Sequence, residues 1–376
     1  MNIRPCLAAF AFGFTFSISP VLQADEFDTW DASKDGKLER EELPERLRPK
    51  FDRVDANGDG AISRAEHEAV RKRAASASAQ PNKPQAPPMP DSVKLLADIP
   101  YAETDNAAQR LDLMLPAKRT TEKLLPVIVF IHGGGWRGGS KLSGRGQVLR
   151  FVQSGDYAGV SVEYRLSGEA QWPAQMHDCK AAIRWLKGHA KEYGLDAEKI
   201  AAWGSSAGGH LAAMLGVSGD VPELEGALGK HTEQTSRVTC VADWYGPTNL
   251  LTIGDAPSKM DHYAADSPVS KLLGGAIQEQ KEKARNASPI TWVSSGDAPV
   301  FIAHGTADPT VPFNQTETFE VALKKANVPV FVQTIEDGAH GGFDGPELQK
   351  RVQAFFDKYL CAVEAPIESG RLKVRH

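Results

Sequence analysis

The chain has 376 residues, of which 41% are hydrophobic and 24% charged, and its formal net charge is −5. This composition allows one large hydrophobic core. Positive and negative residues are mixed along the sequence, which excludes a basic stripe for nucleic acid and a strong charge field of either sign.

The first two dozen residues have the pattern of an export signal. Arg4 is the only charged residue of this segment, and an apolar run from Cys6 to Ile18 ends before Pro20. Such a run is too short to span a bilayer comfortably, so cleavage is favoured over a membrane anchor. We expect residues 1–24 to be a signal peptide, the mature chain to lack a transmembrane span, and the protein to be secreted or periplasmic.

Residues 25–73 are rich in charge and contain two loops, 31–42 and 55–66, with the twelve-residue spacing of calcium sites. Each loop offers oxygen ligands at positions 1, 3, 5 and 9, glycine at position 6, a backbone carbonyl at position 7 and glutamate at position 12. The predicted Ca²⁺ ligands are Asp31, Ser33, Asp35, Lys37, Glu39, Glu42, Asp55, Asn57, Asp59, Ala61, Ser63 and Glu66. Two loops in tandem favour this interpretation over a pair of solvated acidic turns. The apolar residues at position 8, Leu38 and Ile62, can join the loops through a short strand.

This segment resembles a bacterial EF-hand pair, with one departure. The two loops start only 24 residues apart, so one helix over about Glu41–Arg53 has to serve both. That spacing is similar to dockerins, which recognise a partner protein. The resemblance implies a static module that needs calcium to fold, because its apolar core is small. Its expected role is docking to a protein or a surface, or protection from proteolysis.

The composition divides the rest of the chain. Residues 74–92 are dominated by alanine, serine and proline without apolar periodicity, which predicts an extended linker. Residues 93–362 have a globular composition, and residues 363–376 read as a polar tail. Three cysteines remain after signal cleavage, namely Cys179, Cys240 and Cys361. They cannot all pair within one chain, their pairing stays open, and no Cys–His spacing suggests zinc.

The globular part alternates between strand and helix patterns. Continuous apolar runs, as in 125–131, are typical of strands buried on both faces. We expect strands at 125–131, 157–164, 200–203, 238–244, 300–304 and 331–335, and helices at 173–193, 207–215, 315–326 and 348–359. This alternation predicts an α/β fold with a mostly parallel sheet covered by helices on both faces. In such folds ligands bind beyond the carboxyl ends of the strands.

A nucleophile elbow is predicted at Gly204-Ser205-Ser206-Ala207-Gly208, between a strand and a helix. The G-x-S-x-G pattern places a serine on a tight, strained turn, and its glycines let strand and helix approach closely. Ser206 is therefore the expected nucleophile, and the Ala207 amide at the helix start is an expected oxyanion donor. Without its strand and helix context the pattern would be an ordinary glycine turn.

An oxyanion loop is predicted at His132-Gly133-Gly134-Gly135-Trp136, directly after the strand 125–131. Glycines leave their amides bare, so Gly134 and Gly135 can donate to a developing negative charge. A phosphate loop of the Walker type would need Gly-Lys-Ser/Thr, which is absent. We expect His132 to shape this loop and not to act as a base.

The acid and the base of a triad follow two later strands. Asp308 lies in HGTADPTVP and His340 in DGAHGGF, which gives the chain order Ser, Asp, His of α/β-hydrolases. Asp308 would orient the imidazole, and His340 would relay the proton of Ser206. The rival acids are Asp297, Glu336 and Asp337, and the histidines with weaker claims to the role of base are His177, His210 and His304.

The motifs HGGGW, VEYRL, GSSAGGH, DWYGPTNL, SPITWV and HGTADPTVP resemble bacterial esterases related to hormone-sensitive lipase. The similarity is strongest to the BD-FAE branch, which resembles acetyl and feruloyl esterases of plant polysaccharides, and it covers roughly Val93 to Ala362. It implies the α/β-hydrolase fold, the triad Ser206–Asp308–His340 and no cofactor for catalysis. It also implies an ester substrate that is linked to a polysaccharide.

Two long connections, 217–237 and 250–298, are expected to wall the acyl and alcohol pockets. Their aromatic neighbours Trp136, Trp172, Trp244 and Tyr245 are either substrate platforms or core residues. Two other functions stay open. One is a calcium-dependent docking protein with an inactive hydrolase domain, against which the complete triad argues. The other is a peptidase of the same fold, which the HGGGW loop and the lack of a propeller-like repeat disfavour.

Overall fold

The computed structural model describes residues 26–44, 48–69, 88–119, 123–219, 221–343, 345–364 and 366–373. The predicted signal peptide (1–24) and most of the predicted linker lie outside these residues. The chain divides into two compact units, Met1–Gln85 and Ala86–His376. Among the described residues no helix combines the length and apolarity that a membrane crossing needs.

The first unit is built around the two predicted calcium loops. Helix α1 (Glu26–Trp30) precedes the first loop, and strand β1 (Lys37–Leu38) pairs antiparallel with β2 (Ile62–Ser63). Leu38 lies opposite Ile62, as the apolar residues at position 8 predict. The small core of this unit consists of Phe27, Leu38, Leu43, Phe51 and Ile62.

The helix predicted over Glu41–Arg53 is wrong. The described part of this stretch holds turns at residues 41–43 and a 3-10 helix, η1 (Arg48–Arg53). Pro44 and Pro49 explain the difference, because proline lacks the amide hydrogen that an α-helix interior needs and also disfavours a helical residue before it.

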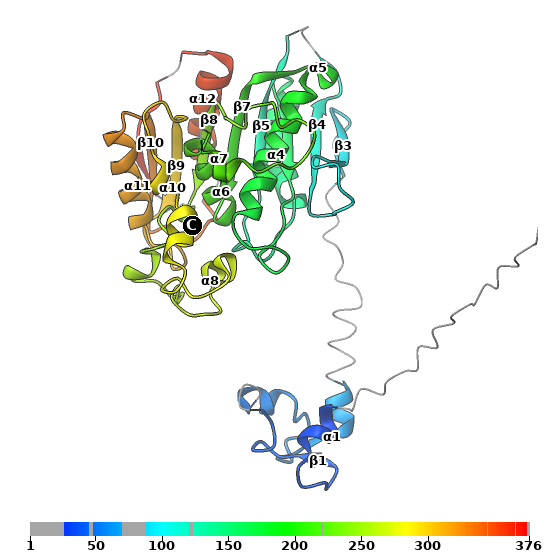
Figure 1. Cartoon of the computed structure of the whole chain (residues 1–376). Helices are drawn as coiled ribbons and strands as arrows, with labels where there is room; N and C mark the ends of the chain where they lie inside the picture. Colours follow the sequence, from blue (N-terminus) through cyan, green and yellow to red (C-terminus); the bar gives the residue numbers. More distant parts are fainter. Residues whose placement is uncertain are drawn as a thin grey trace, which may run out of the picture. The chain divides into compact units, whose positions relative to one another are not determined.

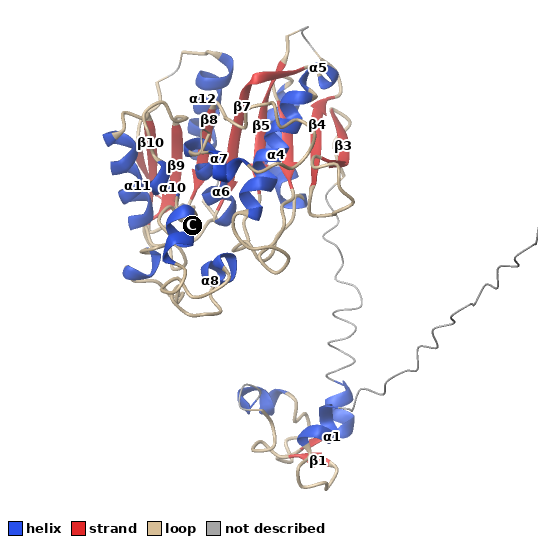
Figure 2. Cartoon of the chain, in the orientation of Figure 1, coloured by secondary structure: helices blue, strands red, loops and turns tan. Residues whose placement is uncertain are grey.

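The second unit contains a nine-stranded sheet (Figure 2). Its order is β11-β10-β9-β8-β7-β5-β6-β4-β3. Strand β4 is antiparallel to both of its neighbours, and all other pairs are parallel. The strands are β3 (Val93–Pro100), β4 (Arg110–Pro116), β5 (Leu125–Ile131), β6 (Ala158–Val162), β7 (Leu195–Ser205), β8 (Cys240–Trp244), β9 (Val300–Gly305), β10 (Val330–Glu336) and β11 (Gly370–Lys373).

Helices cover both faces of this sheet, which confirms the predicted fold class (Figure 1). The main helices are α3 (Leu142–Ser154), α4 (Ala174–Gly188), α6 (Ala207–Val217), α11 (Asn314–Lys325) and α12 (Pro346–Cys361). Shorter ones are α5 (Ala190–Tyr193), α7 (Pro222–Glu225), η2 (Ile253–Asp255), α8 (Pro268–Leu273), α9 (Lys281–Asn286) and α10 (Pro289–Trp292). The core on one face joins α4, α6 and α11, and the core on the other joins α3 and α12. All three cysteines of the described part are free thiols.

The predicted polar tail contributes the ninth strand. Strand β11 adds in parallel to β10 at the edge of the sheet. The side-chain Nε2 of Gln333, a wholly buried residue, donates to the Glu368 carbonyl at 2.8 Å, and the backbone amide of Val332 donates to Ser369 Oγ at 2.9 Å. This part of the tail therefore belongs to the folded unit, because it satisfies polar groups at the edge of β10.

Ending the chain after Glu364 is expected to lower Tm by roughly 2–10 °C, because it removes the pairing of β11 with β10 and the carbonyl that accepts from the Gln333 side chain. Differential scanning calorimetry would measure the shift. A chain ending after Lys373 keeps β11 and serves as the control. Equal Tm for both truncated chains would contradict a stabilising role of this strand.

Candidate active site

Ser206 occupies a strained turn between β7 and α6. Its φ is 55° and its ψ is −122°, a conformation that side chains rarely adopt. The turn is held by the Ser206 amide, which donates to the Trp244 carbonyl at 2.8 Å. A side chain at Gly204 would meet the Gly208 carbonyl, and one at Gly208 would lie 2.0 Å from the Ile131 carbonyl oxygen. Both glycines are therefore required by the close approach of the elements around Ser206.

The three predicted triad residues form one hydrogen-bonded chain. His340 Nε2 lies 2.9 Å from Ser206 Oγ, and His340 Nδ1 lies 2.7 Å from Asp308 Oδ2. Since a carboxylate only accepts, Nδ1 carries the ring proton and Nε2 is left to accept from the serine. Asp308 follows β9 and His340 follows β10, so neighbouring parallel strands bring the pair to the same sheet edge as β7.

Asp308 is held as an anion by several donors. The amides of Thr310 and Val311 donate to its Oδ1 at 2.7 and 2.9 Å, and His304 Nε2 lies 3.2 Å from Oδ2. Burial raises the pKa of Asp308, but the hydrogen bonds from His304, His340 and the Thr310 amide outweigh it and hold this pKa well below its usual range. Asp308 is therefore an ionised carboxylate over the pH range in which it has to orient His340.

His304 is a partner of Asp308 that the sequence reasoning did not identify. Its ring is wholly buried, with Nδ1 2.7 Å from Thr316 Oγ1 and Nε2 3.0 Å from the Val311 carbonyl. His304 lies near the end of β9, four residues before Asp308. This position is the feature of the sequence that could have identified it as a partner of the acid. The three rival acids do not contact His340. Asp297 accepts from Ser294, Glu336 faces Arg371, and the amide of Asp337 donates to Thr306.

The predicted oxyanion donors Gly134, Gly135 and Ala207 line the same cavity as Ser206 and His340. Gly134 and Gly135 have φ values of 114° and 60°, and a side chain on Gly134 would collide with the Gly138 carbonyl. The arrangement places backbone without side chains in the same cavity as Ser206. His132 lies beneath this loop, with Nδ1 2.8 Å from the Gly133 carbonyl and its ring stacked on Tyr164 at 4.3 Å.

A buried histidine on α6, His210, is hydrogen-bonded to the predicted oxyanion loop. The indole NH of Trp136 donates to His210 Nδ1 at 3.2 Å, and His210 Nε2 lies 2.6 Å from the Ala287 carbonyl. Because Nδ1 accepts from the indole NH while Nε2 donates to the carbonyl, the ring carries one proton and is neutral. Burial lowers the pKa of His210 to about 4, and its hydrogen bond to Ala287 opposes this shift only in part. His210 thus connects the loop after β5 with the segment before α10.

The cavity around Ser206 measures about 440 Å³. The long connection 250–298 walls it with Ile253, Met260, His262, Pro268 and Val269. Connection 217–237, which was predicted to wall it too, lies elsewhere in the described structure. Its Glu225 is held by the buried cations Lys180 and Arg184 of α4 at 2.9 and 2.5 Å.

The four candidate aromatic platforms fall into two groups. Trp136 and Tyr245 line the cavity, whereas Trp172 and Trp244 are buried away from it. The indole of Trp136 is itself 3% exposed, so it forms a floor and not an open platform. Tyr245 contacts the edge of the His340 ring at a centroid distance of 4.7 Å and has a strained φ of 47°. It is the aromatic residue best placed to contact a substrate.

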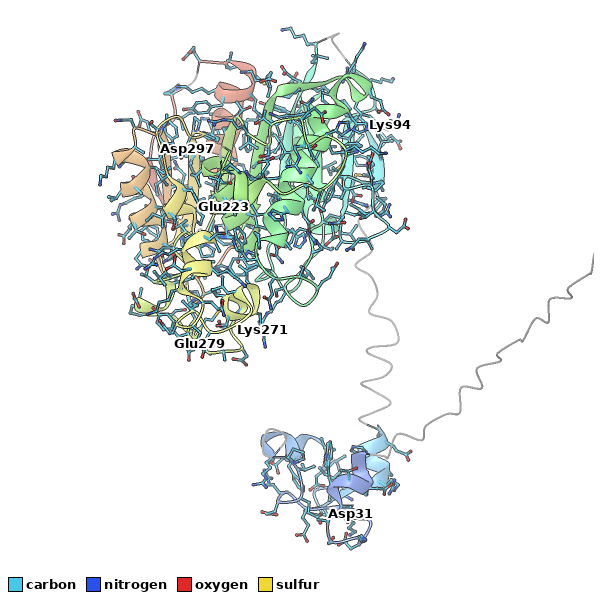
Figure 3. The ribbon with its side chains drawn as sticks, viewed as in Figure 1. Asp31, Lys94, Glu223, Lys271, Glu279 and Asp297 are labelled. Atoms are coloured by element: carbon cyan, nitrogen blue, oxygen red, sulfur yellow. The ribbon has the colours of Figure 1, made fainter. Side chains whose placement is uncertain are left out.

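The predicted calcium loops have the internal hydrogen bonds of EF-hand loops. The glycines at position 6, Gly36 and Gly60, have φ values of 82° and 86°, and their amides donate to the aspartate at position 1 at 2.9 and 3.0 Å. Hydrogen bonds from Ser63, first from its hydroxyl and then from its amide, lower the pKa of Glu66 to about 2. Within the described residues no three His, Cys, Asp or Glu side chains converge as a metal cluster. The loops nevertheless carry the oxygen donors that suit Ca²⁺, with Asp31 marked in Figure 3.

Comparison with known proteins gives two family matches. The BD-FAE family model matches residues 111–323, more than half of the chain, and an EF hand model matches residues 49–66. The chain is 29% identical to "Esterase LipQ" of Mycobacterium tuberculosis, over 66% of this chain and 57% of that protein. It is 27% identical to "Probable isoprenylcysteine alpha-carbonyl methylesterase ICMEL1" of Arabidopsis thaliana, over 63% and 49%. The chain thus spans about half the length of the curated relatives it matches.

Solved structures show the same similarity. A truncated carbohydrate esterase from gut microbiota matches with a TM-score of 0.67 and 29% identity, over 73% of this chain and 99% of that one. The propionate-bound esterase 2 of Thermogutta terrifontis matches with a TM-score of 0.58 and 30% identity, over 75% and 98%.

Two helical glycines provide a matched test of the elbow. Gly208→Ala is expected to lower kcat/KM for an aryl acetate by roughly 100-fold or more, because its new methyl group would push α6 away from β5. Gly146→Ala in α3 meets nothing within 4 Å and should instead stabilise the protein by about 0.5–1 kcal/mol. Steady-state kinetics and calorimetry on both variants would measure these effects. Full activity of Gly208→Ala would show that the elbow tolerates a wider spacing.

Proposed function

The chain belongs to the BD-FAE family, and from this premise we propose that it is a serine carboxylic ester hydrolase with Ser206, His340 and Asp308 as its catalytic triad. One observation carries the proposal. His340 lies within hydrogen-bond distance of both the Ser206 hydroxyl and the Asp308 carboxylate, at 2.9 and 2.7 Å. This is the geometry that proton relay from a serine nucleophile needs.

The reaction proceeds in two halves. Ser206 Oγ attacks the ester carbonyl while its proton moves to His340 Nε2, and Asp308 stabilises the resulting imidazolium. The amides of Gly134, Gly135 and Ala207 stabilise the oxyanion of the tetrahedral intermediate. The C–O bond to the alcohol then breaks, and His340 returns its proton to the leaving alkoxide oxygen. In the second half, water attacks the acyl-serine with the same proton relay and releases the acid.

The substrate we propose is an acetyl or feruloyl ester on a polysaccharide, hydrolysed by an exported enzyme. A carbohydrate esterase from gut microbiota is among the similar structures, which supports a sugar as the alcohol. The cavity of about 440 Å³ suits a short or aromatic acyl group together with part of a sugar. The N-terminal sequence pattern supports export.

Ser206→Ala is expected to lower kcat by about 10⁶-fold on every ester that the enzyme turns over, because the triad acts as one unit. The assay panel contains acetyl, butyryl and feruloyl esters, each tested free and on xylan or pectin. Ser205→Ala, at the preceding position, is the control for local disturbance. Residual activity of Ser206→Ala above a few per cent would rule out this nucleophile, and preference for long acyl chains would replace the polysaccharide esterase with a lipase-like role.

For the first unit we propose a calcium-stapled module that docks to a protein or a surface. Residues Asp31, Ser33, Asp35, Lys37, Glu39 and Glu42 would hold one ion, and Asp55, Asn57, Asp59, Ala61, Ser63 and Glu66 the other, with Lys37 and Ala61 contributing carbonyls. The five-residue core of this unit supports a need for metal, because so small a core contributes little stability.

Removing calcium is expected to expose residues 25–73 to limited proteolysis while the esterase activity persists, because the triad lies in the second unit. Glu42→Gln should weaken calcium binding by about tenfold or more, since it removes a charged ligand that binds through two oxygens. Glu41→Gln, one residue earlier, removes the same charge outside the ligand positions and is the control. Calorimetric titration would measure both, and equal affinities would contradict the assigned ligands.

A further inference from the structure

The active-site cavity is lined, among the described residues, by positive charge without negative charge. Within the described part of the chain, none of the residues that line it is an aspartate or a glutamate, and Arg137 is the one lysine or arginine among them. Arg137 is exposed, and its guanidinium forms no hydrogen bond or ion pair with another described residue. An unpaired cation at the mouth of a cavity attracts anionic ligands, while nothing in the lining repels them.

The backbone at Arg137 is fixed although its side chain is free. Its amide donates to the Gly134 carbonyl at 3.2 Å, and the preceding Trp136 is buried and bonded to His210. Arg137 follows the oxyanion glycine Gly135 by two residues. Its backbone therefore has a constant position relative to the carbonyl of a bound ester. A charge at this position can select substrates by a group that lies outside the scissile ester bond.

Two aspartates of the connection that walls the cavity have hydrogen-bond partners of their own. Asp255 accepts from the hydroxyl of Tyr263, and Asp261 accepts from the amides of Tyr263 and Ala264 at 3.0 and 3.2 Å. Neither aspartate lines the cavity. Since Arg137 forms no ion pair with another described residue, its positive charge is available to a ligand.

A second polar group of the lining lacks a partner. His262 is 3% exposed, and its Nε2 lies 2.9 Å from the Thr310 carbonyl, so Nε2 carries the proton. Its Nδ1 is therefore a buried acceptor, and no donor among the described residues reaches it. Such an atom costs free energy until a donor pairs with it. A sugar hydroxyl is a donor of the required kind.

Arg137 and His262 both line the cavity, and their chain segments meet at the start of α8. Ser267 Oγ donates to the His262 carbonyl at 2.8 Å and caps helix α8. The next residue, Pro268, lies against Gly135, at 3.2 Å from where a side chain on that glycine would begin. The segments that carry Arg137 and His262 are thus in contact at the start of α8, and the His262 ring itself extends to the Thr310 carbonyl in the loop after β9.

We propose that the alcohol pocket binds a uronic acid sugar, with its carboxylate on Arg137 and one of its hydroxyls donating to His262 Nδ1 after a rotation of the ring that uncovers this buried atom. This inference rests on the proposed esterase function and narrows its substrate to esters on acidic polysaccharide. Arginine suits the role because its planar fork matches the two oxygens of a carboxylate. The chain as a whole carries a net charge of −5, so this local cation has to offset a general repulsion of acidic polymers.

The test compares three O-acetylated methyl glycosides that differ at one carbon, namely a galacturonate, its methyl ester and the corresponding galactoside. The wild-type protein is expected to prefer the galacturonate over both neutral substrates by roughly three- to tenfold in kcat/KM, and rising salt should reduce this ratio. Arg137→Gln should bring the ratio close to one. Lys94→Gln on β3, four strands away from β7, removes the same charge and should keep the wild-type ratio (Figure 3).

The ratio of kcat/KM between charged and neutral glycosides distinguishes the uronate site from the esterase function on which it rests. Equal turnover of charged and neutral glycosides by the wild type would overturn the uronate site and leave the esterase function standing. A preference that survives in Arg137→Gln would also overturn it. Loss of activity on all three glycosides with turnover of aryl acetates retained would overturn the sugar substrate together with the uronate site. His262→Leu provides a second readout, because it should lower kcat/KM for the glycosides more than for an aryl acetate that offers no hydroxyl.

Discussion

The hydrogen bond between Ser206 Oγ and His340 Nε2 joins two residues that are 134 positions apart in the sequence. The sheet makes this contact possible, because β7, β9 and β10 are parallel and their carboxyl ends meet at one edge. Two further constraints keep the atoms in place. The strained turn at Ser206 is held by the Trp244 carbonyl, and Asp308 is fixed by two backbone amides and a second imidazole, that of His304. The side chains of the proposed triad are thus held in place without a ligand.

The supports of the site extend well beyond the triad. His210 bridges Trp136, next to the oxyanion glycines, and Ala287, in the long connection that walls the cavity. Since both contacts involve one neutral, buried ring, the nucleophile helix, the oxyanion loop and the cavity wall are mechanically linked. The other long connection is held away from the site by Glu225 and the buried cations of α4. The cavity therefore has one wall that is tied through His210 to the loop after β5 and to helix α6.

The sequence was most informative where apolar runs are uninterrupted. Strand β5 has the bounds predicted from its seven apolar residues, since every one of them is buried. Strand β4 escaped prediction because its buried Asp112, paired with Lys141 and Arg145, breaks the apolar pattern. The motifs around Ser206, Asp308 and His340 were recognisable because local turn chemistry determines them. The roles of His304 and His210 depend on contacts across the fold, with Thr316 and Ala287 among them, and short-range patterns do not contain that information.

Reaction with an organophosphate ester that mimics the tetrahedral intermediate tests the central claim most directly. With diethyl 4-nitrophenyl phosphate, the account predicts release of one equivalent of 4-nitrophenolate and a phosphoryl adduct on the peptide segment that contains Ser206, located by mass spectrometry. The release should slow by orders of magnitude in His340→Ala, because the serine then lacks its proton acceptor. An adduct on another residue, or unchanged labelling without His340, would contradict the account.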